Sequence, residues 1–353
     1  MKEECQRISP KAHLATAQRF LSDAYLFIRF PVLNFSIMLP LLGAITVSPA
    51  LDHTQILGLI GVAVNVHCFA YVMNDIIDLQ VDRSEPLRQE YPLVRGAIQP
   101  AYAFAFSLVQ IPVAFLFTAS LGGAAASFSI LFGVFICAAV YNLRGKRGLY
   151  PPLFDAVLGL ACSAFVLYGA LMMHRTPTAL TGALSALVFV LAVMINGVHG
   201  AVRDLGNDFA MGARTTAVFL GSSPVDGGGV KISRSLLIYA FLLQAAIITI
   251  CLIALIYNLF EYGALAWLIT MSTAVIYAML SLWLLWLSFQ SAHDKWNMIM
   301  FGMLHLVLSL GFLLAFFAFH MTWGVLLALL TAYLVPVLTM WARYGLKWDL
   351  ARS

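Results

Sequence analysis

A run at positions 74–82, Asn-Asp-Ile-Ile-Asp-Leu-Gln-Val-Asp, concentrates one amide and three carboxylates. On a helix, Asn74, Asp78 and Asp82 would share one face, with Asp75 about a quarter-turn aside. Carboxylates four residues apart repel each other unless a cation lies between them, so this run is too acidic for an ordinary polar helix end. Because Mg²⁺ typically takes one or two carboxylates together with substrate phosphates, the run predicts a metal site for a phosphorylated ligand.

A second acidic pair lies far downstream, where Asp204 and Asp208 are again four residues apart and again follow an apolar run. Alone, this pair could be a solvated loop in which Arg203 neutralises Asp204. Two such groups on the same side of a membrane instead predict one site that binds a diphosphate through metal ions.

The composition is that of a polytopic membrane protein. Of 353 residues, 62% are hydrophobic and only 10% are charged, whereas soluble domains carry roughly 25% charge. The net charge of +4 is no sign of nucleic-acid binding, and the five scattered cysteines fit neither a zinc site nor a disulfide framework. Ten apolar runs reach transmembrane length: 30–48, 55–73, 101–121, 123–141, 153–173, 180–199, 234–257, 262–288, 298–319 and 322–342.

The basic residues indicate the orientation of these spans. With a cytosolic N-terminus, 19 of the 20 Lys and Arg residues fall on the cytosolic side, and only Arg175 falls outside. We therefore expect both termini and the acidic loops 74–100 and 200–233 to be cytosolic. Residues 1–29 read as a cytosolic lead-in without a cleavable signal peptide, and 30–353 as one transmembrane domain. A bacterial inner membrane and a eukaryotic endomembrane are equally compatible.

The paired motifs, NDxxDxxxD and DxxxDxxxGxRT, resemble those of the UbiA superfamily of intramembrane prenyltransferases. The resemblance covers roughly residues 29–221. Further matching residues are Arg29-Phe30-Pro31, Pro40, Gly43, Tyr141, Asp155, Gly159 and Gly169.

The resemblance implies an all-α bundle in which nine helices surround a central cavity open sideways to lipid, so that ten apolar runs would add one span. It also implies that an isoprenyl diphosphate binds through Mg²⁺, with two ions neutralising the leaving group. The implied metal ligands are Asn74, Asp78, Asp82, Asp204 and Asp208. The implied catalytic residues are Asp78, Asp204, Asp208 and Tyr141.

Other polar residues have two explanations each. The candidates for diphosphate binding are Asp75, Arg88, Arg95, Arg144, Lys146, Arg147, Arg203 and Arg214, although the cations among them are also explained as topology charges. Tyr141 would steady an allylic cation through its ring face. The candidates for contact with an acceptor or the cavity are His67, Asn142, Asn196 and His199, which inter-helix hydrogen bonds explain equally well. His199 could orient an acceptor or accept a proton.

These features favour transfer of a prenyl group to an acceptor, expected to be a small aromatic compound or quinone precursor, beside membrane lipid. A UbiA-type terpene cyclase, which needs no acceptor, is the alternative, because Gly206-Asn207 and the segment 85–96 depart from the family pattern. An ion-coupled transporter is a third hypothesis. It would place its carboxylates at mid-membrane in broken helices, whereas both acidic groups here end apolar runs.

Overall fold

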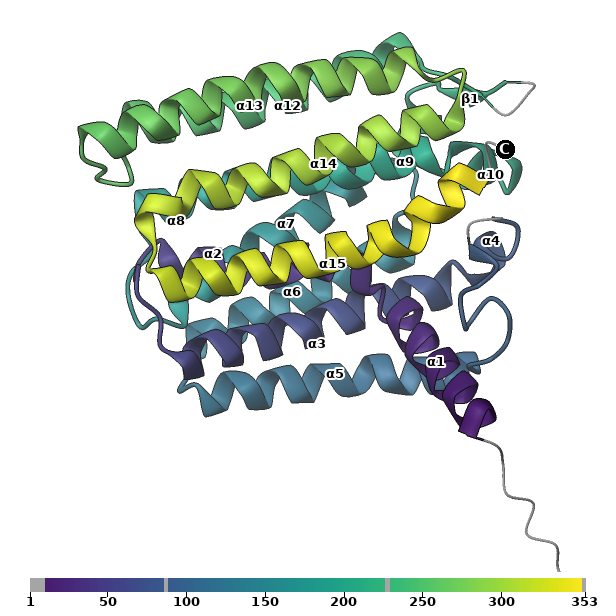
Figure 1. Cartoon of the computed structure of the whole chain (residues 1–353), viewed down its shortest axis with the longest axis horizontal. Coiled ribbons are helices and arrows are strands. Elements are labelled where there is room, and N and C mark those ends of the chain that lie inside the picture. Colours follow the sequence, from purple (N-terminus) through teal and green to yellow (C-terminus); the bar gives the residue numbers. More distant parts are fainter. Residues whose placement is uncertain (1–9, 86–87, 226–228, 351–353) are drawn as a thin grey trace, which may run out of the picture.

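The computed structural model describes residues 10–85, 88–225 and 229–350, with side chains described between 18 and 342. The chain forms a bundle of long helices that lie side by side (Figure 1). These helices are α2 (Leu33–Ile45), α3 (His53–Ile77), α5 (Pro100–Ser120), α6 (Ala125–Arg144), α7 (Pro151–Leu171), α8 (Ala179–Val193), α12 (Arg234–Ile256), α13 (Ala264–Gln290), α14 (Lys295–Phe317) and α15 (Trp323–Leu350).

The helix α1 (Pro10–Phe27) precedes α2. Short elements join the long helices, mostly at the end that carries both acidic motifs. They are η1 (Phe30–Val32), α4 (Leu79–Asp82), the π-helix η3 (Met194–Gly200), α9 (Ala201–Arg203), α10 (Leu205–Ala210), α11 (Thr216–Phe219) and η4 (Ala318–His320). The strands β1 (Ser223–Pro224) and β2 (Val230–Lys231) form a short antiparallel pair. Each acidic motif therefore lies where a long helix passes into short ones.

The number of spans agrees with the expected nine to ten. Among the described residues, nine helices are long and apolar enough to cross a membrane. A tenth results if Gln18–Phe27 and Phe30–Ile45, bent by 48°, count as one broken span. The bend lies at Arg29, which adopts a left-handed conformation (φ 48°). The last apolar run forms the apolar part of α15. The protein is an integral membrane protein, and its single domain over 30–353 stays a prediction.

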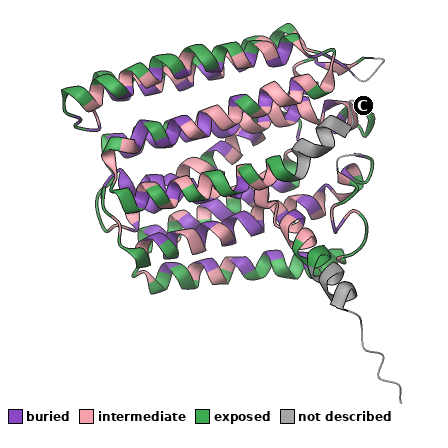
Figure 2. Cartoon of the chain, viewed as in Figure 1, coloured by how far each residue is buried: buried purple, intermediate pink, exposed green. Residues whose placement is uncertain are grey.

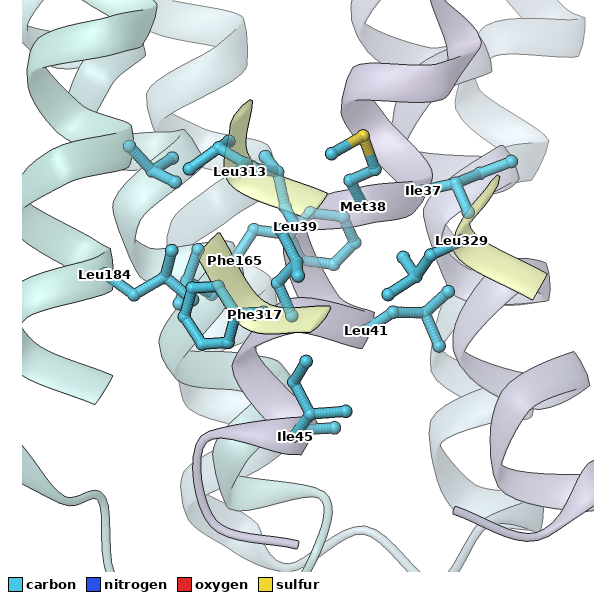
Figure 3. Close-up of a cluster of buried hydrophobic side chains, with 14 of the residues drawn as sticks. Ile37, Met38, Leu39, Leu41, Ile45, Phe165, Leu184, Leu313, Phe317 and Leu329 are labelled. Carbon is cyan, nitrogen blue, oxygen red and sulfur yellow. The ribbon is translucent and has the colours of Figure 1, made fainter. Parts of the chain in front are cut away.

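The centre of the bundle is packed around α2. Met38, Leu41 and Ile45 are fully buried. Figure 3 shows the α2 side chains packed among residues of other helices, including Phe165 of α7 and Phe317 of α14. The outer helices show many exposed residues (Figure 2), among them large apolar side chains such as Trp283 and Leu268. That exposure suits a surface in contact with lipid rather than water.

Two glycines bring α2 and α7 into backbone contact. A Cβ added at Gly43 would lie 1.9 Å from the carbonyl oxygen of Val166, and one added at Gly169 would lie 1.9 Å from that of Pro40. Small residues let membrane helices approach closely enough for backbone packing. Because the clashing atoms belong to backbone, no rotation of a side chain could relieve them.

We expect Gly43→Ala to destabilise the protein by about 1–3 kcal/mol, because α2 and α7 would have to separate. The measurement is the midpoint of thermal unfolding in detergent. The matched control is Gly133→Ala in α6, where an added Cβ meets no atom within 4 Å. An unchanged midpoint for Gly43→Ala would contradict the close contact.

Candidate metal and diphosphate site

The first acidic motif lies at the end of α3. Asp78 caps this helix, since its N–H bonds to the carbonyl of Asn74, and α4 then carries Asp82. Asp75, Asp78 and Asp82 are all buried, with 5–6% of their surface exposed. Buried carboxylates are costly unless they are paired with cations or hydrogen-bonded, so the residues around them must supply positive charge.

Two arginines supply part of this charge. Arg29, at the bend between α1 and η1, forms an ion pair with Asp75 and also donates to Asn74 Oδ1 at 3.3 Å. Arg88 Nη1 lies 3.5 Å from Asp75 Oδ1 and 3.7 Å from Asp82 Oδ2. Arg29 was absent from the site predicted from sequence. The available signal was its place in Arg29-Phe30-Pro31, which matches the family pattern at the start of the first apolar run.

The second acidic motif begins where α9 ends. Arg203 holds Asp204 with two parallel contacts of 2.7 Å, from Nε to Oδ1 and from Nη2 to Oδ2. Four residues on, Asp208 in α10 is only 1% exposed. The contact between Arg203 and Asp204, which the sequence offered only as the alternative to a metal site, is present in the structure, and it leaves Asp208 to other cations. Diphosphate binding by Arg203 stays a prediction.

Lys146 brings the two motifs together. Its Nζ lies 3.5 Å from Asp78 Oδ2 and 3.2 Å from Asp208 Oδ1. Its carbonyl accepts a hydrogen bond from the N–H of Arg214 at 2.9 Å, which ties the segment after α6 to the chain after α10. The ends of α3 and α10 thus share one ammonium group.

Asn207 forms a second link between the motifs. Its side-chain amide donates to the carbonyl of Val81 at 2.9 Å, and its Oδ1 accepts from Ser84 Oγ at 2.8 Å. This residue departs from the family pattern, and sequence reasoning gave it no role. Its position between two acidic residues was the only available signal, since its partner is more than 120 residues away.

The donor set suits a hard divalent cation. Neither buried oxygen of Asp208 accepts a hydrogen bond from a described residue, and carboxylate and amide oxygens are the ligands that Mg²⁺ prefers. Among the described residues, no three carboxylate, imidazole or thiol groups lie close enough to hold an ion. Metal binding therefore requires these carboxylates to exchange their cationic partners for the ion.

Burial and charge set the protonation of this site. Burial raises the pKa of Asp208 to about 6, partly offset by Lys146, and it raises the pKa of Asp78 for the same reason. Asp204 shows the opposite shift: burial acts to raise its pKa, but the paired guanidinium of Arg203 outweighs burial and lowers it. The pKa of Lys146 is raised, since Asp78 and Asp208 outweigh the opposing effect of burial.

Tyr141 lies in a separate hydrogen-bonded group. Asn196 in η3 donates to Tyr141 Oη and to Asp155 Oδ1, each at 2.6 Å, and Thr216 donates to the other oxygen of Asp155. Inter-helix hydrogen bonding, the alternative explanation for Asn196, is therefore what the structure shows, and contact of Asn196 with an acceptor or the cavity stays a prediction. Asp155 and Thr216 support the arrangement from α7 and α11.

Among the described residues, several of the predicted ones form no ion pair or side-chain hydrogen bond with the carboxylates of either motif. Arg95 pairs with Asp23 of α1, and Arg147 donates to the carbonyl of Ile77 at 3.0 Å. Arg144 and Arg214 have exposed side chains. His67 contacts Ser36 Oγ and the carbonyl of Ile28, and Asn142 donates to the carbonyl of Ala70. For His67 and Asn142, inter-helix hydrogen bonding is what the structure shows.

A small pocket, with a cavity volume of about 10 Å³, lies beside the first motif. It is lined by Asp75 and Asp82, by Phe27 at the end of α1, and by residues 91–94 of the first loop. The larger cavity that the family resemblance implies stays a prediction.

The profile of the UbiA prenyltransferase family matches residues 36–305. The chain belongs to this family. The chain is 27% identical over 182 residues to the digeranylgeranylglyceryl phosphate synthase of Pyrococcus horikoshii, a stretch that covers 51% of this chain and 62% of the relative's length. The chain therefore spans about three fifths of that protein.

Solved structures share the fold. A UbiA homologue from Archaeoglobus fulgidus bound to GPP and Mg²⁺ superposes with a TM-score of 0.61 at 17% identity, covering 83% of this chain and 98% of that one. An apo UbiA homologue from Aeropyrum pernix gives a TM-score of 0.60 at 18% identity, with 81% and 95% covered.

We expect Mg²⁺ affinity to weaken as the pH falls through 6. A protonated carboxyl cannot ligate, so a group whose pKa is about 6 makes binding about tenfold weaker at pH 5 than at pH 7. Titration calorimetry at several pH values measures this dependence. In Asp208→Asn the affinity should be lower at neutral pH and vary less over this range; an unchanged pH dependence would contradict the assignment.

Proposed function

We propose that this protein transfers an isoprenyl group from a prenyl diphosphate to an acceptor inside the membrane, in an Mg²⁺-dependent reaction. The observation that carries the proposal is the convergence of the two acidic helix ends on Lys146. A homologue from A. fulgidus with the same fold was solved with GPP and Mg²⁺ bound, which supports a prenyl diphosphate and Mg²⁺ as the ligands.

The proposal assigns the metal to oxygen atoms of both motifs. Asn74, Asp78, Asp82, Asp204 and Asp208 would hold the Mg²⁺, for which we propose two ions. Bound metal supplies positive charge to the diphosphate as the allylic C–O bond breaks. The carboxylates now occupied by Lys146, Arg88 and Arg203 would turn to the metal, which frees these side chains to bind phosphate oxygens.

Tyr141 is positioned for the second half of the reaction. Its hydroxyl is held by Asn196, so the orientation of the ring is restricted, and its face would stabilise an allylic cation. Asp155 accepts hydrogen bonds from Asn196 and from Thr216, and this arrangement keeps Asn196 in place.

The acceptor is proposed to be a small aromatic compound or quinone precursor. The Pyrococcus relative is named for a glyceryl phosphate product. A glyceryl phosphate should therefore be tested as an acceptor beside the aromatic compounds. We further propose that the acidic end and both termini face the cytosol, because this orientation places 19 of the 20 basic residues on that side.

Purified protein in detergent should release diphosphate from C10, C15 or C20 prenyl diphosphates only when Mg²⁺ is present. A prenylated product that requires an acceptor supports a transferase. A cyclic hydrocarbon or alcohol formed without an acceptor would instead assign the protein as a terpene cyclase. If no substrate releases diphosphate in a metal-dependent way, both activities are contradicted. Ion-coupled transport is then the remaining hypothesis.

Two substitutions on α3 make a matched test of the metal ligands. Asp78→Asn should lower diphosphate release by roughly a hundredfold or more, because one charge that holds the metal is lost. Asp52→Asn removes the same charge at the opposite end of α3, where Asn caps a helix as well as Asp does, and activity should be retained. Equal losses in both variants would show that the effect is structural.

A further inference from the structure

A chain of buried polar side chains leads away from the acidic site into the C-terminal helices. His199 Nε2 lies 3.0 Å from His305 Nδ1, and His305 Nε2 lies 3.0 Å from Gln244 Oε1. Gln244 Nε2 then donates to Ser281 Oγ at 2.8 Å. The chain connects η3 with α14, α12 and α13 (Figure 1). His305, Gln244 and Ser281 are completely buried.

The order of donors and acceptors fixes the tautomer of both histidines. The amide nitrogen of Gln244 points to Ser281, so its oxygen faces His305 and can only accept. His305 Nε2 must therefore carry a proton, which makes Nδ1 of the neutral ring an acceptor. His199 Nε2 must in turn donate to that Nδ1. The remaining nitrogen, His199 Nδ1, is left with a lone pair.

His199 Nδ1 has no hydrogen-bond partner among the described residues, and His199 is only partly buried, unlike His305, Gln244 and Ser281. A Cβ added at Gly302 of α14 would lie 3.0 Å from this nitrogen. A larger residue at position 302 would therefore crowd the lone pair.

We propose that His199 is the base that takes up the proton released during prenyl transfer. This inference rests on the proposed function. In the reaction, the allylic C–O bond breaks and its electron pair leaves with the diphosphate, and a nucleophilic atom of the acceptor bonds to the cation. The acceptor's bond to hydrogen then breaks, its electrons stay with the product, and the proton goes to His199 Nδ1.

His305 acts as a positioning residue in this arrangement. Once His199 is protonated, its Nε2 proton lies on a 3.0 Å contact to His305 Nδ1, so the positive charge is shared by two rings. The carbonyl oxygen of Gln244 accepts from the far end of the second ring and holds it in place. A purely structural link between helices would need only hydrogen-bonding groups. This row of side chains instead contains two titratable rings, and one ring nitrogen has no hydrogen-bond partner among the described residues. An ionisable group at membrane depth is by default a candidate functional group.

The test separates ionisation from proton removal. For wild type and His199→Gln, diphosphate release and prenylated product are measured in the same reaction with an accepted acceptor. Because the metal site is intact, release should stay within about twofold of wild type. The ratio of product to released diphosphate should fall roughly tenfold or more, with prenyl alcohol formed instead as water captures the cation.

The matched control is His320→Gln, which removes another partly buried imidazole beyond the far end of α14; its product ratio should match wild type. An unchanged ratio in His199→Gln would overturn the proposal. So would a parallel loss of release and product together with a lower unfolding midpoint, because that result indicates a purely structural link. Wild type that releases no diphosphate would instead contradict the proposed function itself.

Gly302→Ala keeps every polar group. If His199→Gln does not fold, this variant tests whether His199 takes up the proton. The added methyl group would crowd Nδ1, and the next nearest atoms are Ser288 Oγ at 3.5 Å and a carbon of the same imidazole ring. We expect a lower product ratio with diphosphate release retained. A wild-type ratio in this variant, when His199→Gln is unfolded, would overturn the proposal.

Discussion

Five carboxylates lie at the mouth of this helical bundle, and their burial requires cations from several parts of the chain. Arg29 comes from the bend before α2, Arg88 from the first loop, Lys146 from the segment after α6, and Arg203 from the end of α9. A carboxylate left without its partner in such a place would be strongly destabilising. Charge balance therefore determines where these four segments end and how they meet.

The same balance explains how the site could exchange ligands. Each carboxylate contacts a flexible basic side chain, but the five carboxylates share four cations, because Lys146 contacts both Asp78 and Asp208. In the proposed function, the metal would take over carboxylates while the phosphate oxygens take over the freed cations. Lys146 has the central place in this exchange, because it touches both motifs.

Regular patterns in the sequence predicted the spans, the helix ends and the acidic residues that meet there. Hydropathy predicts spans because every backbone polar group in lipid must be satisfied within a helix, and the spacing of Asp204 and Asp208 predicts a shared face. Contacts between distant segments have no such local pattern. Asn207 bonds to Val81, and Arg95 turns away to Asp23, and both outcomes depend on how the loops pack in three dimensions.

The π-helix η3 has a consequence for chemistry that only the structure reveals. In an α-helix, residues three apart share a face, so Asn196 and His199 would point to the same neighbour. The wider turn of a π-helix separates them: Asn196 faces Tyr141 and Asp155, while His199 faces His305 of α14. The segment η3 thus contains both Asn196, which is hydrogen-bonded to Tyr141, and His199, whose Nδ1 has no hydrogen-bond partner among the described residues. Since α9 and Asp204 follow directly, groups suited to stabilising a cation, taking up a proton and binding metal lie within a few turns of one another.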